Sequence, residues 1–455
     1  MSVEILARLQ FAVTIMFHYI YPPLSIGLGL LLVIMEGLFL KTKQPIYHQM
    51  ARFWTKVFAL TFAIGVATGI VMEFEFGTNW ATYSRYVGDV FGSALAAEGV
   101  FAFFLESGFL ALLLFGWNKV GPKMHFFSTL MVCLGAHFSA IWIIVANSWM
   151  HTPAGFHIVG EGLSARAEIV SFWAMVLNPS SVHRLTHSVV GCWLAGSFLV
   201  ISVSAYYLLK KKYREFSVKS LKIALALAAV SLILQAFLGS VSAKGVAKNQ
   251  PMKFAAFEGV YQTKPRVPLV LFGVPNSENQ TIGYALSIPK LLSFLAYDDF
   301  EAEVKGLNEV PRKDWPNVSA VFMTYRLMLA MWGMMVAVLL ISLWKWRKGT
   351  LLDSSLTLKL LIFSVFCPQI ANQAGWVAAE MGRYPWIVQD LLRISEGLSK
   401  AVSANQVLGS LIMFSVIYAL LFFLFIYLLN AKIKAGPREE DLSTPYHGLS
   451  KVIGE

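Results

Sequence analysis

The sequence contains little charge. Of its 455 residues, 14% are Asp, Glu, Lys or Arg and 57% are hydrophobic, whereas a soluble domain has about 25% charged residues. The mean hydropathy is +0.62. This composition excludes an ordinary soluble domain and predicts an integral membrane protein that is embedded in a lipid bilayer.

The charge that is present is mostly basic, with a net charge of +11. A strongly basic chain can bind nucleic acid, but here the Lys and Arg residues lie in short loops between apolar segments. This placement is typical of membrane topology. We therefore expect no nucleic-acid partner.

Cysteine is also scarce. Cys133, Cys192 and Cys367 lie within or beside apolar runs, and there is no CxxCH motif and no cysteine cluster. Covalently attached c-type haem and iron–sulfur clusters are therefore not expected. A cleavable signal peptide is not expected either, because Glu4 and Arg8 precede an apolar run that is longer than the roughly 15 residues of a signal core.

Long apolar runs, by contrast, are abundant. A helix that crosses a bilayer needs about 20 apolar residues, and about nine runs approach or exceed that length. We therefore expect an all-α polytopic membrane protein with about nine transmembrane helices. The runs cover residues 11–40, 57–76, 93–117, 126–149, 187–209, 221–239, 319–344, 359–380 and 406–429.

Basic residues alternate between the connecting loops. They gather in residues 41–56, 119–123, 210–219 and 345–348 and in the tail at 432–438, whereas the other loops have mixed or sparse charge. The positive-inside rule places the basic loops in the cytoplasm. The N-terminus is then outside and the C-terminus is cytoplasmic, as an odd number of spans requires.

One connection is unusually long, polar and rich in proline. Loops of this length are usually functional or disordered, and its aromatic and aliphatic residues favour a folded external lid. We divide the chain into helices 1–6 (residues 1–239), this external loop (240–318), helices 7–9 (319–430) and a cytoplasmic tail (431–455). No internal repeat is evident, which argues against a transporter built from inverted halves.

Several residues that can ligate iron lie inside the apolar runs. His18 in the first run and His187 at the start of the fifth are imidazoles of the kind that hold haem iron. Met328, near the outer end of the seventh run, is a candidate second ligand, and Arg326 beside it can pair with a haem propionate. The alternatives are a histidine bonded to a neighbouring helix and a methionine that fills the core.

Carboxylates also lie in the apolar runs, where charge is costly. In a regular α-helix Glu98 and Glu106 are about 80° apart around the axis and about 12 Å apart along it. This spacing favours a proton relay over two carboxylates that are simply bonded to partner helices. Glu380, at the end of the eighth run, suits either an iron ligand or a proton donor. We expect Glu73 and Glu75 at the membrane interface.

Six stretches of the chain, in order, carry a resemblance to a known family. They read RLQF…FHY, GVATGIVMEFEFGTNW, EGVFAFFLES, VANSWM, KFAAFE and AAEMGRYPW. This pattern, which covers residues 8–386, resembles subunit I of bacterial cytochrome bd-type quinol oxidases. The MEFxFGTNW and GRxPW motifs are specific.

The resemblance implies roles for individual residues. His187 and Met328 resemble the axial ligands of a low-spin b haem, while His18 and Glu380 resemble ligands of two further haems; which of them holds the oxygen-binding iron stays open. Arg326 and Arg383 resemble arginines that hold propionates. The oxygen site and its proton supply would involve Glu98, Glu106 and Trp376. Asn147 resembles the start of a second polar route, and Lys253 and Glu258 resemble quinol-site residues.

The resemblance also implies an activity and its partners. We expect a haem-bearing quinol:oxygen oxidoreductase of the bacterial cytoplasmic (inner) membrane that oxidises quinol outside and reduces O2 to water with cytoplasmic protons, building a proton-motive force without pumping. Its cofactors would be two b-type haems plus haem d or a third b-type haem. A second subunit, and possibly a small single-span one, would accompany it. The external loop is of the short form. The alternatives are a haem-free proton-coupled transporter and a non-catalytic assembly subunit.

Overall fold

The computed structural model describes residues 1–443, and within that range nine helical segments are long and apolar enough to cross a membrane. The prediction of about nine spans is confirmed. The first span joins α1 (Val3–His18) to α2 (Tyr21–Thr42), and the eighth joins α14 (Ser355–Phe363) to α15 (Phe366–Met381). The others are α3 (Pro45–Thr78), α5 to α6 (Gly88–Phe115), α7 (Pro122–His151), α9 (Ser181–Leu209), α10 (Arg214–Asn249), α13 (Val318–Arg347) and α17 (Ala404–Ala435).

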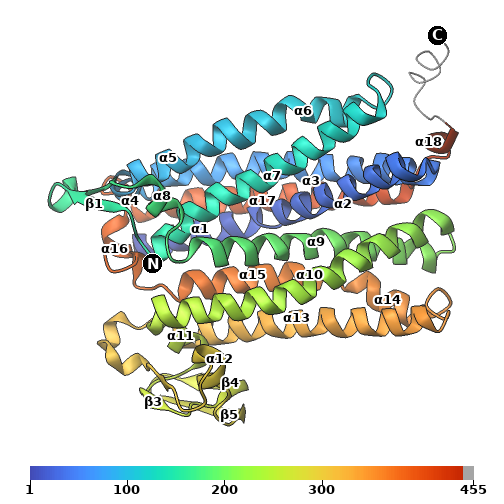
Figure 1. The fold of residues 1–455 in the computed structure, drawn as a ribbon. Helices are drawn as coiled ribbons and strands as arrows, with labels where there is room; N and C mark the ends of the chain where they lie inside the picture. Colours follow the sequence, from blue (N-terminus) through green and yellow to red (C-terminus); the bar gives the residue numbers. More distant parts are fainter. Residues whose placement is uncertain (444–455) are drawn as a thin grey trace.

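The long helices lie side by side in one elongated bundle (Figure 1). The contact between α2 and α9 is so close that a Cβ on Gly27 would lie 2.4 Å from the Cys192 carbonyl oxygen, and a Cβ on Gly196 would lie 2.4 Å from the Gly27 carbonyl carbon. Small residues let membrane helices approach in this way. The three cysteines are buried and free.

The two ends of the bundle differ. The N-terminus and the long loop after α10 lie at one end, and the short helix α18 (Glu440–Ser443) lies at the other (Figure 1). Two hairpins and three short helices pack together at the N-terminal end: β1–β2 (Phe156–Val159 and Arg166–Ile169), β7–β8 (Trp386–Val388 and Leu392–Arg393), α4 (Ala81–Tyr86), α8 (Phe172–Val176) and α16 (Ile394–Gly397).

The long loop is folded. It contains α11 (Pro251–Glu258), the antiparallel hairpin of β4 (Leu269–Asn276) and β5 (Thr281–Ile288), the helix α12 (Leu291–Tyr297), and the short pair β3–β6 (Lys264–Pro265 with Glu303–Val304). Phe254, Val267, Leu292 and Leu307 form a buried core with the end of α13 at Val321. This lid was predicted from the apolar content of the loop.

Two helices continue beyond the apolar runs that predicted them. The helix α10 continues past residue 239 to Asn249, and α17 continues past residue 430 to Ala435. Within the predicted tail 431–455, residues 444–455 lie outside the described part of the chain.

The third span is not a regular α-helix. A π-helical turn, Gly99–Phe103, separates α5 (Gly88–Glu98) from α6 (Phe104–Phe115). A π turn holds one residue more than an α turn, so the eight steps from Glu98 to Glu106 cover the angle of about seven α-helical steps, or about two full turns. The predicted separation of about 80° is therefore wrong, and the two carboxylates share one face.

Candidate functional site

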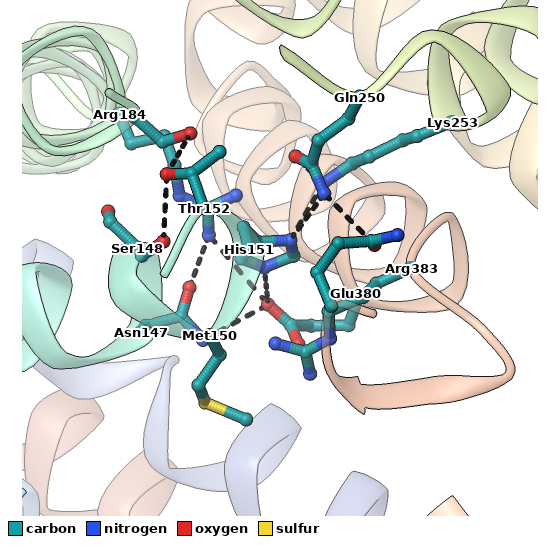
Figure 2. A network of polar contacts seen from close by, with 12 residues as sticks. Asn147, Ser148, Met150, His151, Thr152, Arg184, Gln250, Lys253, Glu380 and Arg383 are labelled. Carbon is teal, nitrogen blue, oxygen red and sulfur yellow. Dashed lines mark hydrogen bonds and ion pairs between the residues drawn. The ribbon is translucent and has the colours of Figure 1, made fainter. Parts of the chain in front are cut away.

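Glu380 is the centre of a polar network at the N-terminal end of the bundle (Figure 2). Its Oε1 accepts a hydrogen bond from Asn147 Nδ2 at 3.1 Å and lies 3.0 Å from His151 Nε2. Its Oε2 accepts from Arg383 Nη2 at 2.7 Å. The last two turns of α7 and the end of α15 bring these side chains together, so residues far apart in the sequence share one carboxylate.

Two further cations complete this network. Arg184 Nη2 on α9 lies 3.7 Å from Glu380 and donates to the Asn147 side chain. Lys253 on α11 lies 3.1 Å from His151 Nδ1 and is only 3% exposed. Burial, together with the charge of Arg184, holds the pKa of Lys253 well below its ordinary value. The Glu380 carboxylate thus faces two guanidinium groups, those of Arg184 and Arg383, so the network has one positive charge in excess and can accept a further anionic group.

A cavity of about 420 Å³ adjoins the network. It lies between α9, α10, α11, α13 and α15, and it is lined by His187, Met328, Trp376, Lys253 and Glu258 among others. A Cβ on Gly375 would lie 2.7 Å from the Met328 sulfur, so glycine there makes room for the thioether. The cavity therefore joins two of the predicted haem ligands, His187 and Met328, to the predicted quinol-site residues.

Glu258 pairs with the arginine that sequence analysis assigned to a propionate. Arg326 Nη2 donates to Glu258 Oε2 at 2.6 Å, while its other donors reach the carbonyl oxygens of Val270 and Phe257. Burial raises the pKa of Glu258, and Arg326 opposes that rise. Gly259 follows Glu258 directly and ends α11. Its backbone is left-handed, with φ 68°, a conformation that glycine adopts without steric cost.

Glu98 and Glu106 both face α7. Ser139 donates to Glu98 Oε1 at 2.5 Å. Glu106 packs against Gly135, where a Cβ would lie 2.4 Å from Glu106 Cγ. Gly135 and Ser139 are one turn apart on α7, so the two carboxylates follow each other along the same helix.

His18 stands apart from the cavity at the end of α1. Its Nδ1 lies 2.9 Å from the Thr68 hydroxyl, which leaves Nε2 as the nitrogen free to ligate. The neighbouring Tyr19 stacks on Trp376 with ring centroids 5.5 Å apart. Trp376 thus links the end of α1 to the cavity.

These residues fit haem better than a free metal ion. Within residues 1–443 no three His, Cys, Asp or Glu side chains gather as a metal site, whereas haem brings its own equatorial nitrogens and needs only one or two protein ligands. Arg383 Nε and Nη1 and Arg184 Nε are buried and have no hydrogen-bond partner. Unsatisfied guanidinium donors suit carboxylates such as propionates.

Sequence reasoning missed His151 and Arg184, which belong to this network. Both could have been identified from the sequence, because His151 directly follows the VANSWM stretch and Arg184 lies in the first turn of an apolar helix. Glu75, expected at the membrane interface, lies three residues before the end of α3 and is 2% exposed. Its Oε1 accepts from the Thr14 hydroxyl at 2.6 Å, because α1 covers this face of α3.

The nine spans within residues 1–443, the imidazole and thioether groups at one cavity, and the buried guanidinium donors without partners together indicate a class, the membrane-embedded haem oxidoreductases. Comparison with known proteins gives the family. The family described as cytochrome bd terminal oxidase subunit I matches residues 6–437. The chain belongs to this family of haem-containing terminal quinol oxidases, and it is a multi-pass protein of a bacterial cytoplasmic membrane.

Individual relatives agree with this assignment over nearly the whole chain. Cytochrome bd ubiquinol oxidase subunit 1 of Bacillus subtilis (strain 168) is 36% identical and covers 99% of this chain and 100% of its own length. Cytochrome bd-II ubiquinol oxidase subunit 1 of Escherichia coli (strain K12) is 34% identical, with coverages of 95% and 96%. The bd oxidase structure from Geobacillus thermodenitrificans superposes with a TM-score of 0.88 at 27% identity, covering 96% of this chain and 99% of that one.

Proposed function

We propose that this chain oxidises a membrane quinol at the outer face and reduces O2 to water with protons from the cytoplasm. The observation that carries the proposal is the shared cavity: Glu258 and Lys253 line it together with His187 and Met328. A quinol bound there would contact both a proton acceptor and an electron acceptor. Charge separation, without pumping, then builds the proton-motive force.

The chain would hold two b-type haems plus haem d or a third b-type haem. The haems would accept electrons from quinol and deliver them to O2, and the protein would supply ligands, arginines and proton paths. His187 and Met328 would ligate one low-spin b haem, and His18 and Glu380 would serve the other two. Arg383 and Arg184, with buried unpaired donors, would hold propionates.

Glu258 would act as the general base for quinol. A carboxylate within hydrogen-bond reach of a hydroxyl can take its proton as electrons leave. Arg326, at 2.6 Å, fixes the orientation of this carboxylate. Lys253, whose pKa is lowered by burial, can donate a hydrogen bond at the other side of the cavity.

Glu106 and Glu98 would carry protons from the cytoplasm toward the oxygen site. Their shared face on the third span and their contacts with Gly135 and Ser139 support this role. The basic loops 41–56 and 119–123 would lie in the cytoplasm, with the folded loop outside. Subunit II and possibly a small single-span subunit would complete the oxidase in the bilayer.

The visible spectrum of the purified complex, dithionite-reduced minus oxidised, tests this proposal together with pyridine haemochrome analysis. We expect b-type bands, with a red-shifted chlorin band if haem d is present and without it if all haems are b-type. A flat spectrum from folded protein would contradict the proposal and favour a haem-free transporter.

The variant His187→Ala tests the ligand assignment. It should lose the low-spin b haem, because an alanine cannot ligate iron. His183→Ala is the matched control: this histidine is one turn earlier on α9 and contacts Ser242 instead. It should keep the full spectrum. Equal spectra for both variants would remove His187 from the haem site.

A further inference from the structure

The helix α7 contacts four buried or partly buried carboxylates, each from a different helix. From its first turns to its last these are Glu36 on α2, Glu106 on α6, Glu98 on α5 and Glu380 on α15. The last three belong to the site described above. Glu36 has no part in it, although it is 3% exposed and lies at the end of α7 that carries the basic loop 119–123.

Glu36 is held by two side chains of α7. The Thr129 hydroxyl donates to Glu36 Oε1 at 2.7 Å, and His125 Nδ1 lies 3.0 Å from Glu36 Oε2. His125 and Thr129 are fully or almost fully buried, at 0% and 1% exposure. Each partner can both give and take a proton, so the cluster is a chain of exchangeable protons.

One nitrogen of this cluster is able to form a further hydrogen bond. His125 Nε2 is buried and has no hydrogen-bond partner. The ring of Trp117, in the loop between α6 and α7, covers His125 with centroids 3.8 Å apart. The titratable neighbours from α3 are His48, edge-on to Trp117, and Arg52, above the same ring.

We propose that His125, Glu36 and Thr129 form the proton uptake site at the cytoplasmic end of α7, which supplies Glu106. His125 takes a proton at Nε2 and passes its Nδ1 proton to Glu36 Oε2, so the imidazole ends neutral in the other tautomer. Glu36 passes a proton on through the Thr129 hydroxyl. Water reaches His125 when the Trp117 ring moves aside. This inference rests on the proposed function.

Ser128 provides the step from this cluster to Glu106. It is fully buried, directly precedes Thr129, and lies seven residues before Gly135, against which Glu106 packs. Seven residues make about two helical turns, so Ser128 and Gly135 lie on the same side of α7. The remaining rise from Thr129 to Gly135 is about 9 Å, a distance that a short chain of water molecules can bridge.

The test compares two buried carboxylates in the complete oxidase. Glu36→Gln removes a proton-accepting group and keeps the shape of the side chain. Positioned proton transfer contributes about a hundredfold or more to a rate, so losing one carrier should lower O2 consumption at least about tenfold. The solvent isotope effect in D2O should rise, because proton delivery becomes limiting. Glu36→Asp should recover much of the rate.

Glu75→Gln is the matched control, since Glu75 is equally buried and accepts a threonine hydroxyl at 2.6 Å, but belongs to α3. It should keep O2 consumption within about twofold of the unmodified enzyme, because it lies outside the proton route. Anaerobic reduction of the haems by quinol should be normal in both variants, because that step takes up no cytoplasmic proton.

Each outcome separates the uptake site from the proposed function. Equal turnover and isotope effects in Glu36→Gln and Glu75→Gln would overturn the uptake site and leave the oxidase intact. Haems that quinol cannot reduce in the unmodified complex would overturn the proposed function and this inference with it. If Glu36→Gln does not assemble, Thr129→Val and His125→Gln replace it, with normal turnover in both overturning the inference.

Discussion

At the scale of single residues, the buried carboxylates differ in whether their hydrogen-bond partners are charged or neutral. Glu380 faces Arg184 and Arg383, and Glu258 faces Arg326. Each of these carboxylates thus has a guanidinium partner, which favours its anionic form. Glu98 receives a serine hydroxyl. A carboxylate with only a neutral donor can gain and lose protons more easily than one beside a guanidinium, which suits Glu98 to a relay.

Glu258 gives a prediction for pH dependence. A general base works when it is ionised, so the rate of quinol oxidation should rise as pH rises through its pKa. Burial raises this pKa, so the acid limb of the pH–rate profile should lie above the usual carboxylate value of about 4.3. Steady-state quinol oxidation measured across pH checks this position.

The variant Glu258→Gln should lose this limb and most of the turnover while the haem content stays normal. Glu301→Gln, in the same loop but exposed and paired with Lys290 and Arg266, serves as control. Its profile should match the unmodified enzyme. An acid limb that survives in Glu258→Gln would assign the base to another group.

The sequence was sufficient to find candidate residues but not their partners. His18, His187, Glu98, Glu106 and Glu380 were identifiable because a polar side chain is costly in an apolar run. The pairing of Arg326 with Glu258 was not, since it depends on how the loop folds back onto α13. The same holds for His151, whose partners are 99 to 229 residues away in the sequence.

At the scale of elements, the π turn in the third span sets the geometry of the proposed proton relay. It places Glu98 and Glu106 on one face, although their spacing in a regular helix would turn them apart. Hydropathy gave the position of this helix, because apolar length suffices for a span. It could not give the turn, because one extra residue leaves the apolar character unchanged.

The π turn can be tested by changing the helix length. Deleting Phe101, whose side chain is 59% exposed, should convert the turn to α-helix while Glu98 and Glu106 keep a common face. O2 consumption should stay within about threefold of normal. Inserting one alanine after Phe103 rotates Glu106 by about 100° and should lower the rate at least about tenfold.

Oxygen-electrode rates per haem provide the measurement for both length variants. The two rates should be compared with each other, because the deletion and the insertion each change the same helix by one residue and differ in the face on which they place Glu106. Equal losses in the two would show that the common face of the carboxylates does not matter, and that local helix integrity does.

At the scale of the whole molecule, the orientation in the membrane is testable because the three native cysteines are buried. Asn279→Cys, in the exposed turn between β4 and β5, should react with an impermeant maleimide in intact spheroplasts. Lys348→Cys, exposed after α13, should react only after lysis. The reverse pattern would invert the topology predicted from basic loops.

The polar contacts along α7 stop and start again. Between Ser139, which holds Glu98, and Asn147, which holds Glu380, residues 140–146 are all apolar and span about 12 Å. An unbroken polar line would let protons leak through the protein and discharge the membrane. In the proposed oxidase this apolar interval would separate the proton route through Glu98 from the network around Glu380, so protons that enter from one side would be consumed by the reaction rather than conducted to the other.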